Sequence, residues 1–420
     1  MDILFIHGNY PAQFRTLAEL FGKQSVHRVC YLTARKDPEE YPLKGVIPVR
    51  FKDIESSKNQ HNLGPLHDII ARGLLIQQEV TKLLQKGFKP KLVFFHGGNG
   101  LGMYLRQILP EAKLVGYFEW YFSKRCAKLI LGKDDLATLN YITSRNIPTE
   151  SEILSCDAAV VPTDWQRSQF PSKLQHHLTT IFDGVDTQYF RPPDPSFSEN
   201  SIDIQGEDCM VTIKPDNLLL SYATRGMEPL RGFPEFMRAL PPLLKQLPQL
   251  KVIIGGRDRC AYGPCAPSHG GSWKQLMLDE LGDFKGKDRV FFTGLMNYDN
   301  YRNLLWRTNL HCYLTLPYVT SWSFFEAMAC GAPMLFNKSK ATHITEDDHA
   351  TLQLEKLTDI SQEKVVLKIT EILQKQNQHR ESHLPEKYNL KACIQEWETC
   401  INDTLKISSQ ANNSSEKQSA

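Results

Sequence analysis

Residues 310–336 read LHCYLTLPYVTSWSFFEAMACGAPMLF, and this stretch decides the fold class. The apolar runs 310–316 and 332–336 have the length of buried strands. Between them, residues 323–330 predict a short helix that has serines at its start and Gly331 as its C-terminal stop. A strand, a helix and a second strand in this order form a βαβ unit, whose two strands run parallel in one sheet.

The same alternation of strands and helices extends over most of the chain. Before residue 187 the pattern predicts strands at 2–6, 28–32, 46–50, 92–95, 113–118, 157–162 and 178–182, and helices at 12–22, 66–86 and 100–109. From residue 217 it predicts strands at 217–222, 251–254 and 289–294, and helices at 233–246, 273–281 and 298–306. We therefore predict an α/β protein with two similar parallel sheets.

Changes in composition suggest where the domains begin and end. The first α/β half spans residues 1–186, and the proline-rich, polar stretch 187–216 is interpreted as the interdomain connection. The second half spans 217–388, and residues 389–407 predict a closing helix. The tail 408–420 is rich in Ser, Asn and Gln, which favours disorder.

Composition excludes several classes of protein. With 420 residues, the chain is long enough for two domains of ordinary size. A net charge of +2 argues against nucleic acid as the main partner, and no apolar run approaches the roughly 20 residues of a membrane span. The N-terminus lacks the basic start of a signal peptide, and the ten cysteines are scattered, so we expect a reducing, cytoplasmic location.

One group of thiols raises the question of a metal site. Cys260, Cys265 and His269 lie in RCAYGPCAPSHGG, but their spacing matches no common zinc pattern and a fourth ligand is not evident. A Gly/Pro-rich loop with incidental thiols is the favoured interpretation. We therefore expect no metal and no other cofactor.

Two segments after predicted strands carry groups that suit a nucleoside diphosphate. At the start of the helix in 317–333, backbone N–H groups and the hydroxyls of Ser321 and Ser323 can meet phosphate, and Glu326 can accept ribose hydroxyls. The alternative is a plain buried helix that has serine caps. In LLLSYATRGMEPLRGF (218–233), Arg225 and Arg231 can hold a diphosphate, whereas the alternative is a pair of solvated surface arginines.

Together these segments resemble the retaining glycosyltransferases of family 4. That family has the GT-B fold, in which two Rossmann-like domains face a central cleft. Its Gly-Arg and Lys-Gly stretches correspond to Arg225 and to Arg231–Gly232, with arginine in place of lysine, and its Glu-Ala-x-Ala-x-Gly-x-Pro corresponds to Glu326–Pro333. FDGVD (182–186) resembles the family's Asn-Gly-Val-Asp, and the resemblance covers roughly residues 1–340.

The sequence departs from the family pattern at three places. Tyr318 stands where the family has a glutamate that contacts the transferred sugar. The usual Gly-Gly after the first strand is reduced to Gly8 in HGNYPAQF, and Glu119 falls where a histidine normally follows the strand 113–118. The tyrosine carries no negative charge, which puts the sugar identity and the catalytic competence in question.

The resemblance implies a sugar transfer from a UDP- or GDP-sugar to an acceptor hydroxyl, with retention of configuration and without a metal ion. The residues it implies for catalysis are Arg225, Arg231, Glu119 and His96. Those implied for donor binding are Arg225, Arg231, Gly294, Tyr318, Thr320, Ser321, Ser323 and Glu326, and those for the acceptor side are His7, Gly8, Asn9, His96 and Glu119. The helix at 389–407 would cross back to the N-terminal domain.

Two other functions remain open on the same residues. One is a nucleotide-sugar-binding partner subunit without turnover, and the other is a GT-B nucleotide-sugar epimerase. The acceptor is a carbohydrate, a lipid-linked sugar, a small molecule or a protein, and the sequence does not choose among them. Lys124, Arg125, Lys128 and Lys133 form either a solvated face, which is favoured, or a basic face toward a phospholipid surface or an acidic acceptor.

Overall fold

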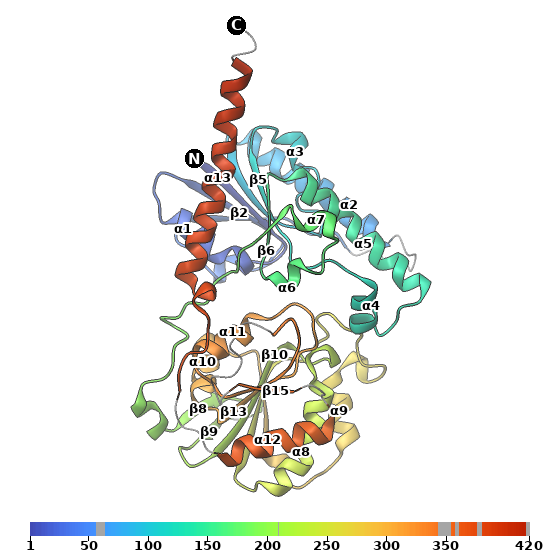
Figure 1. The fold of residues 1–420 in the computed structure, drawn as a ribbon, viewed down its shortest axis with the longest axis vertical. Helices are drawn as coiled ribbons and strands as arrows, with labels where there is room; N and C mark the ends of the chain where they lie inside the picture. Colours follow the sequence, from blue (N-terminus) through green and yellow to red (C-terminus); the bar gives the residue numbers. More distant parts are fainter. Residues whose placement is uncertain (56–63, 209, 343–353, 358–360, 376–379, 417–420) are drawn as a thin grey trace. The chain divides into compact units, whose positions relative to one another are not determined.

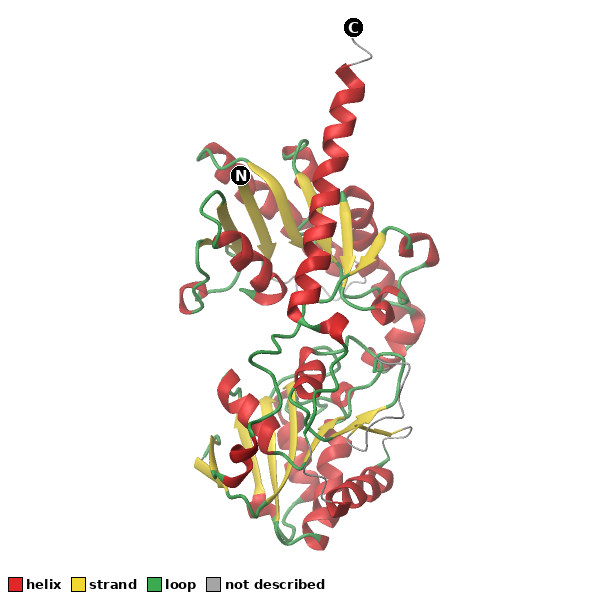
Figure 2. Ribbon diagram, turned by 60° about the vertical axis from the view of Figure 1, so that its left-hand side comes forward, coloured by secondary structure: helices red, strands yellow, loops and turns green. Residues whose placement is uncertain are grey.

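The computed structural model describes residues 1–55, 64–208, 210–342, 354–357, 361–375 and 380–416. The chain divides into two compact units, each built around a sheet with helices against it (Figures 1 and 2). The first unit comprises Met1–Ala127, Asp134–Gly184 and Leu390–Ala420, and the second comprises Lys128–Lys133 and Val185–Asn389. The predicted α/β class is confirmed.

The first unit contains a seven-stranded parallel sheet in the order β3-β2-β1-β4-β5-β6-β7. Its strands are β1 (Asp2–His7), β2 (Arg28–Thr33), β3 (Val46–Arg50), β4 (Pro90–His96), β5 (Lys113–Tyr117), β6 (Ala158–Val161) and β7 (Leu178–Thr180). Its helices are α1 (Arg15–Gly22), α2 (Gly64–Gln85), α3 (Leu105–Ile108), α5 (Leu136–Ser155), α6 (Asp164–Arg167), α7 (Ser172–Gln175) and α13 (Leu390–Glu416), with 3-10 turns at Ala12–Phe14 and Pro38–Glu40. The strand order reverses between β1 and β4, which is where such sheets open a ligand site.

Helix α13 joins the first unit although it comes last in the sequence. Its Trp397 is buried in the same hydrophobic cluster as Phe94 of β4 and Tyr117 of β5, with ring centroids 6.3 and 6.5 Å away. The helix therefore covers one face of this sheet and extends to Glu416. Residues 408–416, which the composition assigned to a disordered tail, are helical because they continue α13, and residues 417–420 lie outside the described part.

The second unit contains a six-stranded parallel sheet in the order β12-β11-β10-β13-β14-β15. Its strands are β10 (Leu218–Gly226), β11 (Leu250–Arg257), β12 (Val290–Gly294), β13 (Leu310–Tyr313), β14 (Met334–Asn337) and β15 (Leu354–Leu357). Its helices are α8 (Phe233–Gln246), α9 (Trp273–Leu281), α10 (Tyr298–Arg307), α11 (Trp322–Ala329) and α12 (Gln362–Lys375). Short 3-10 turns occur at Pro195–Glu199, Pro229–Arg231, His269–Gly271, Lys287–Arg289 and Glu386–Tyr388.

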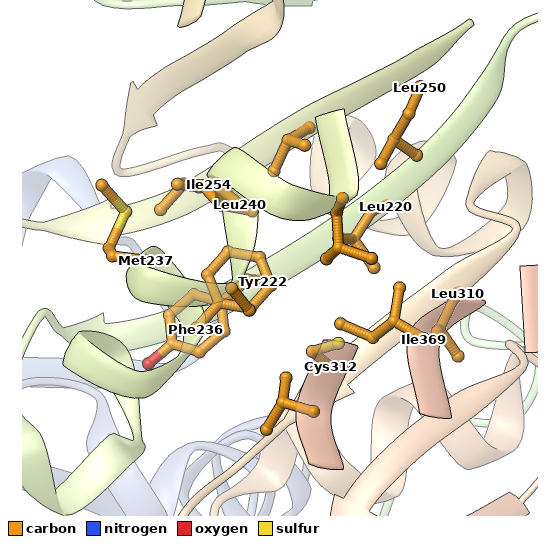
Figure 3. Packing of buried hydrophobic residues seen from close by; sticks show 14 of the residues in the cluster. Leu220, Tyr222, Phe236, Met237, Leu240, Leu250, Ile254, Leu310, Cys312 and Ile369 are labelled. Atoms are coloured by element: carbon orange, nitrogen blue, oxygen red, sulfur yellow. The ribbon is translucent and has the colours of Figure 1, made fainter. Parts of the chain in front are cut away.

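The core of the second unit lies between its sheet and the pair α8 and α12, which run side by side (Figure 1). Figure 3 shows Tyr222 of β10 and Phe236 of α8 in contact at its centre, and their rings stack with centroids 4.6 Å apart. Ile369 of α12 and Cys312 of β13 close the other side of the cluster. This packing fixes the end of β10 against the start of α8, which is where the candidate site lies.

Residues 187–216, predicted as an interdomain connection, fold with the second unit instead. They contain strands β8 (Ile202–Gln205) and β9 (Met210–Ile213), which pair antiparallel. Inward-facing Ile204 and Ile213 pack on Leu219 of β10, because both strands alternate buried and exposed residues. This alternation of buried and exposed residues is typical of strands, but the prolines in the stretch led to its interpretation as a connection.

Two further differences concern helices. The helix predicted over 100–109 is reduced to α3, because Gly98 and Gly100 adopt positive φ values of 83° and 84° and hold the preceding residues in turns. Helices α4 (Lys124–Leu131), α5, α6, α7 and α12 were not predicted. The N-cap of α5 is a visible signal, since the side chain of Asp135 accepts a 2.8 Å hydrogen bond from the Thr138 amide. Among the described residues, the helices are all too short or too polar to cross a membrane.

Candidate functional site

The clearest candidate site lies where β10 and β13 end, because the strand order of the second sheet reverses between them. Arg225 is the penultimate residue of β10 and is exposed, and Arg231 ends the 3-10 turn that leads into α8. The two arginines singled out from the sequence therefore lie at the carboxyl end of one strand. The described ion pairs of arginines in this unit involve Arg191, Arg238 and Arg302 instead.

Arg231 is buried although it is charged, and it forms hydrogen bonds through both its side chain and its backbone carbonyl. It is 4% exposed, its Nη1 donates to Thr315 Oγ1 at 3.4 Å, and its carbonyl accepts from the Tyr222 hydroxyl at 2.9 Å. Its Nε is buried with no hydrogen-bond partner among the described residues. A buried guanidinium N–H without an acceptor is costly, so this nitrogen favours an anion at the site.

Gly232 sets the direction of Arg231. It adopts the left-handed conformation with φ 68° and ψ 21°, and a Cβ there would lie 2.5 Å from Leu314 Cβ. Only glycine combines this backbone with so close an approach to the end of β13. The contact explains why an Arg-Gly pair, and not arginine alone, occurs at this turn.

Tyr262 connects the arginines to Tyr318 and was not predicted. Arg225 Nη1 donates to its hydroxyl at 3.2 Å, and the Arg231 guanidinium carbon lies 5.5 Å from its ring centroid. Tyr318, which is 5% exposed, packs edge-on against the same ring with centroids 5.2 Å apart. Tyr318 therefore belongs to this cluster through Tyr262. The sequence offered no signal for Tyr262 beyond its place two residues after Cys260.

Glu228 anchors the loop that carries Tyr262. Its Oε2 accepts hydrogen bonds from the amides of Ala261, Tyr262 and Gly263 at 3.0, 3.0 and 2.9 Å, and the residue is fully buried. Its Oε1 has no partner among the described residues. A carboxylate that receives three amides rigidifies the loop after β11, so Glu228 is a positioning residue that sequence reasoning missed.

The start of α11 differs in part from the prediction. Ser321 is the N-cap residue, but its side chain makes no capping hydrogen bond, and its hydroxyl and amide lie 3.0 and 3.1 Å from the Tyr313 hydroxyl. Ser323 Oγ lies 3.1 Å from Ser321 Oγ. Thr320 is buried and donates its hydroxyl to the Ala341 carbonyl at 2.7 Å. Thr320 is therefore structural here, because its side chain already has a partner away from the helix start.

Glu326 lies one turn into α11, and no described residue donates a hydrogen bond to its carboxylate. Burial raises its pKa to about 8. Gly294, the remaining donor residue predicted from the sequence, ends β12 with a positive φ of 59°. It therefore lies at the carboxyl end of a third strand of the same sheet, two strands away from β10.

The first unit gathers three of its predicted residues at its own reversal of strand order. His7 ends β1, His96 ends β4, and their rings lie 4.5 Å apart. His96 Nε2 is 3.3 Å from Glu119 Oε2, and Gln13 Nε2 donates to Glu119 Oε1 at 2.8 Å. Burial opposes the ionised form of Glu119, but the hydrogen bond and charge of His96, with the bond from Gln13, lower its pKa to about 2.

His7 is a buried neutral imidazole. Burial and the nearby His96 lower its pKa to about 3, and its Nδ1 accepts the Asn9 amide at 2.8 Å. Its Nε2 has no described partner. Asn9 therefore acts through its backbone, and nothing lies within 4 Å of a Cβ added at Gly8, so Gly8 leaves open space beside this turn.

Glu152 supports the loop after β4 and was also missed. It is fully buried in α5, and its carboxylate accepts the amides of Gly98 and Gly102 at 2.6 and 2.9 Å. Burial raises its pKa to about 7 although these amides favour the ionised form. Two backbone amides of the glycine-rich stretch after His96 thus donate to a carboxylate that lies 54 and 50 residues further along the chain.

The thiols considered for zinc do not form a metal site in the described part of the chain, where no group of three or more metal-ligating side chains occurs. Cys260 Sγ instead donates to the Gly271 carbonyl at 3.6 Å, and His269 Nε2 pairs with Asp279 at 2.7 Å.

Comparisons with known proteins give one matching family model and several similar solved structures. Residues 25–190 match the profile of the glycosyl transferase family 4 group, which is less than half of the chain. Over these residues the chain is similar to that family. Sucrose-phosphate synthase from Thermosynechococcus elongatus is 13% identical, with a TM-score of 0.66 over 97% of this chain and 100% of that one. Comparison with curated protein sequences gives no match.

Other solved structures also resemble nearly the whole chain. HepE from Anabaena, solved in complex with UDP, is 15% identical with a TM-score of 0.58, covering 99% of this chain and 100% of that one. A UDP-N-acetylglucosamine 2-epimerase from Listeria monocytogenes, so described in its own structure, is 14% identical with a TM-score of 0.56 over 96% of both chains. These likenesses establish the glycosyltransferase-type GT-B fold, and at such identities they establish the fold alone.

Proposed function

We propose that this protein is a retaining glycosyltransferase that moves a sugar from a UDP- or GDP-sugar to an acceptor hydroxyl. One observation carries the proposal. At the reversal of strand order in the second sheet, two arginines without a described acid partner and Glu326 without a described donor lie after β10 and β13. The arginines supply positive charge for a diphosphate, and the Glu326 carboxyl group supplies hydrogen-bond acceptors for a ribose.

Donor binding follows from the chemistry of these groups. Arg225 and Arg231 would bind the diphosphate, since a guanidinium presents paired N–H donors to phosphate oxygens. The first-turn amides of α11 add donors and the positive end of the helix dipole. Glu326 would accept the ribose hydroxyls, and Gly294 leaves room for the base. UDP is the first nucleotide to test, because HepE was solved with it.

The chemical step would be front-face departure. The bond from the sugar's anomeric carbon to the phosphate oxygen breaks, and the acceptor oxygen forms its bond to that carbon on the same face. The acceptor proton passes to the departing phosphate oxygen. Arg225 and Arg231 stabilise the negative charge that grows on the leaving group, and loss of one such donor costs about 10²–10³ in kcat. No metal and no other cofactor takes part in this proposal.

The groups of the first unit suit the sugar and acceptor side. Glu119 is ionised throughout the physiological range because of its low pKa, so it can accept hydrogen bonds from sugar hydroxyls but cannot supply a proton. His96, which it contacts, can share one of those hydroxyls. His7 and the turn at Gly8 and Asn9 would complete this side. The acceptor itself could be a carbohydrate, a lipid-linked sugar, a small molecule or a protein.

Tyr318 favours a second candidate, a nucleotide-sugar-binding subunit without turnover. It replaces a family glutamate and is buried against Tyr262. A GT-B epimerase is the third candidate on the same donor site. Incubation with UDP-glucose separates the three, since a transferase releases UDP in the presence of an acceptor, an epimerase changes the sugar without an acceptor, and a binder does neither.

The first experiment is thermal shift with UDP, GDP, ADP and CMP in the presence of a chelator. One diphosphate should raise the midpoint by mass action, Arg225→Ala should remove the rise, and Glu326→Gln should reduce it. Lys245→Ala is the control, because Lys245 is exposed near the end of α8, away from the carboxyl ends of the strands. If no nucleotide shifts the protein, or if the two site variants behave like the control, the donor site is wrongly assigned.

A second experiment tests the stereochemistry. With an α-linked donor sugar, a retaining enzyme gives an α-linked product, which proton NMR of the anomeric signal identifies. A β-linked product would contradict retention while leaving the donor site intact.

A further inference from the structure

Three arginines, and not one, crowd the carboxyl ends of β10 and β11. Arg225 lies at the end of β10, Arg257 is the last residue of β11, and Arg259 follows two residues later. Gly226 pairs in register with Arg257, and the Arg259 amide donates to the Arg257 carbonyl at 2.9 Å. All three side chains are exposed. Arg257 and Arg259 were not among the residues that the sequence motifs singled out.

The backbone holds these arginines close to one another. A Cβ on Gly226 would lie 2.6 Å from the Arg259 carbonyl oxygen, and the Met227 amide donates to the Arg257 carbonyl at 3.3 Å. The side chains are near enough to repel. Partial burial and the charges of Arg225 and Arg257 together lower the pKa of Arg259. The cluster therefore has an electrostatic cost in the free protein.

No described carboxylate offsets that cost with an ion pair. The ion pairs described for arginines of this unit involve Arg191, Arg238 and Arg302. Asp258, which stands between two of the three, accepts a hydrogen bond from Ser272 at 2.7 Å. The charge of the buried Glu228 carboxylate raises the pKa of Arg259, while its Oε2 accepts the three amides of the loop. The three arginines thus have a buried carboxylate whose charge offsets part of their repulsion, but no ion pair is described for any of them.

We propose that Arg257 and Arg259, together with Arg225, bind a second oxyanion group, a phosphate or a carboxylate, carried by the sugar substrate. The proposed function already uses Arg225 and Arg231 for a diphosphate, and this inference rests on it for the location of the site. Two further guanidinium groups exceed what a diphosphate ester needs. Their forked N–H donors match phosphate and carboxylate oxygens equally, so the shared chemistry is an oxyanion. The group belongs either to the donor sugar, as in a uronic acid, or to a phosphorylated acceptor.

The test uses inorganic phosphate as the probe, on the full chain with and without an excess of UDP, and against sodium chloride of equal ionic strength. The variant Arg257→Gln/Arg259→Gln is compared with Lys245→Gln/Lys285→Gln, which removes the same charge from exposed lysines elsewhere in the unit. We expect phosphate to raise the midpoint of the wild type and the lysine variant. The arginine variant should bind phosphate about tenfold more weakly or worse, since charge-assisted hydrogen bonds are lost. Equal phosphate shifts in both variants, or none in the wild type, would overturn the inference.

The UDP shift keeps this result separate from the proposed function. If UDP binds and phosphate does not, the donor site stands and the oxyanion site falls. If phosphate binds through the arginines and UDP does not bind, the oxyanion site stands and the donor site falls. Two further pairs of ligands locate the source: UDP-glucuronate against UDP-glucose for the donor, and glucose 6-phosphate against glucose for the acceptor. An arginine-dependent preference in one pair identifies that substrate, and a preference in neither overturns the assignment to a substrate.

Discussion

The affinity of the second unit for UDP should rise with pH, because Glu326 must ionise to bind the ribose well. Burial raises its pKa to about 8, so the free protein carries a mostly neutral carboxyl group at neutral pH. Ribose hydroxyls donate hydrogen bonds, and a carboxylate accepts them better than a carboxylic acid does. UDP binding therefore favours the ionised form and releases a proton below the pKa of the free group.

The magnitude follows from the fraction of Glu326 that is ionised. With a pKa of about 8, that fraction is about one eleventh at pH 7 and about ten elevenths at pH 9, which is a tenfold change. Tenfold in Kd corresponds to about 1.4 kcal/mol of binding free energy. Above the pKa the affinity should reach a plateau, and below it the affinity should fall about tenfold for each pH unit.

The assay is isothermal titration calorimetry with UDP between about pH 7 and pH 9. In this window the UDP phosphates are already ionised, since the second pKa of a phosphate monoester is about 6. Glu326→Gln is the matched variant, because it keeps the shape and cannot ionise, and its affinity should be flat with pH. Buffers of different ionisation enthalpy should reveal proton release by the wild type alone. A flat wild-type profile, or an equal slope in the variant, would refute the role given to Glu326.

Three further predictions concern the support of the two sites. Gly232→Ala should destabilise the second unit more than Gly270→Ala. The two glycines have nearly the same φ and ψ, so the left-handed backbone costs both variants about 1–2 kcal/mol. A Cβ at Gly270 meets open space, whereas the clash of a Cβ at Gly232 with Leu314 costs about 1–3 kcal/mol more. Equal losses in urea unfolding would contradict the contact with β13. Burial raises the pKa of Glu152 from 4.5 to about 7 in the folded protein. Its contribution to the free energy of unfolding is therefore fully present below about pH 4.5, and about 3 kcal/mol of that free energy is lost as the pH rises through 7. Urea unfolding against pH should show this decline in the wild type and not in Glu152→Gln, whereas parallel curves would argue against it. Trp397→Ala should destabilise the first unit by about 3–5 kcal/mol, measured by calorimetry, because the ring is buried on β4 and β5; a loss below about 1 kcal/mol would show that α13 is not docked there.

The fold was predictable because parallel strands buried on both faces leave near-continuous apolar runs. LVFF in β4 and KVII in β11 are such runs, and each predicted strand of both large sheets is present. The hairpin β8–β9 was missed because its signal is only two alternating apolar pairs inside a proline-rich stretch. Helix α5 was missed because one of its faces is polar and it contains Pro148, which ordinarily argues against a helix interior.

Only some residues of the candidate site could be predicted from the sequence. Groups that follow a strand directly, such as Arg225, His96 and Glu119, could be predicted because strand ends are visible in sequence. Tyr262 and Glu228 could not be predicted in this way. They reach the site through a loop whose course depends on three amides meeting one buried carboxylate, and that pairing has no local sequence pattern.

The strand order explains why both sheets place their polar groups at corresponding positions. In the first sheet β1 and β4 are neighbours whose following segments leave in opposite directions, and His7 and His96 stand at their ends. In the second sheet β10 and β13 hold the same relation, and Arg231 contacts Thr315 across it. A gap between diverging loops leaves side chains at strand ends short of protein partners, so those side chains are available to a ligand. The unpartnered Nε2 of His7 and Nε of Arg231 are what this geometry produces in each unit.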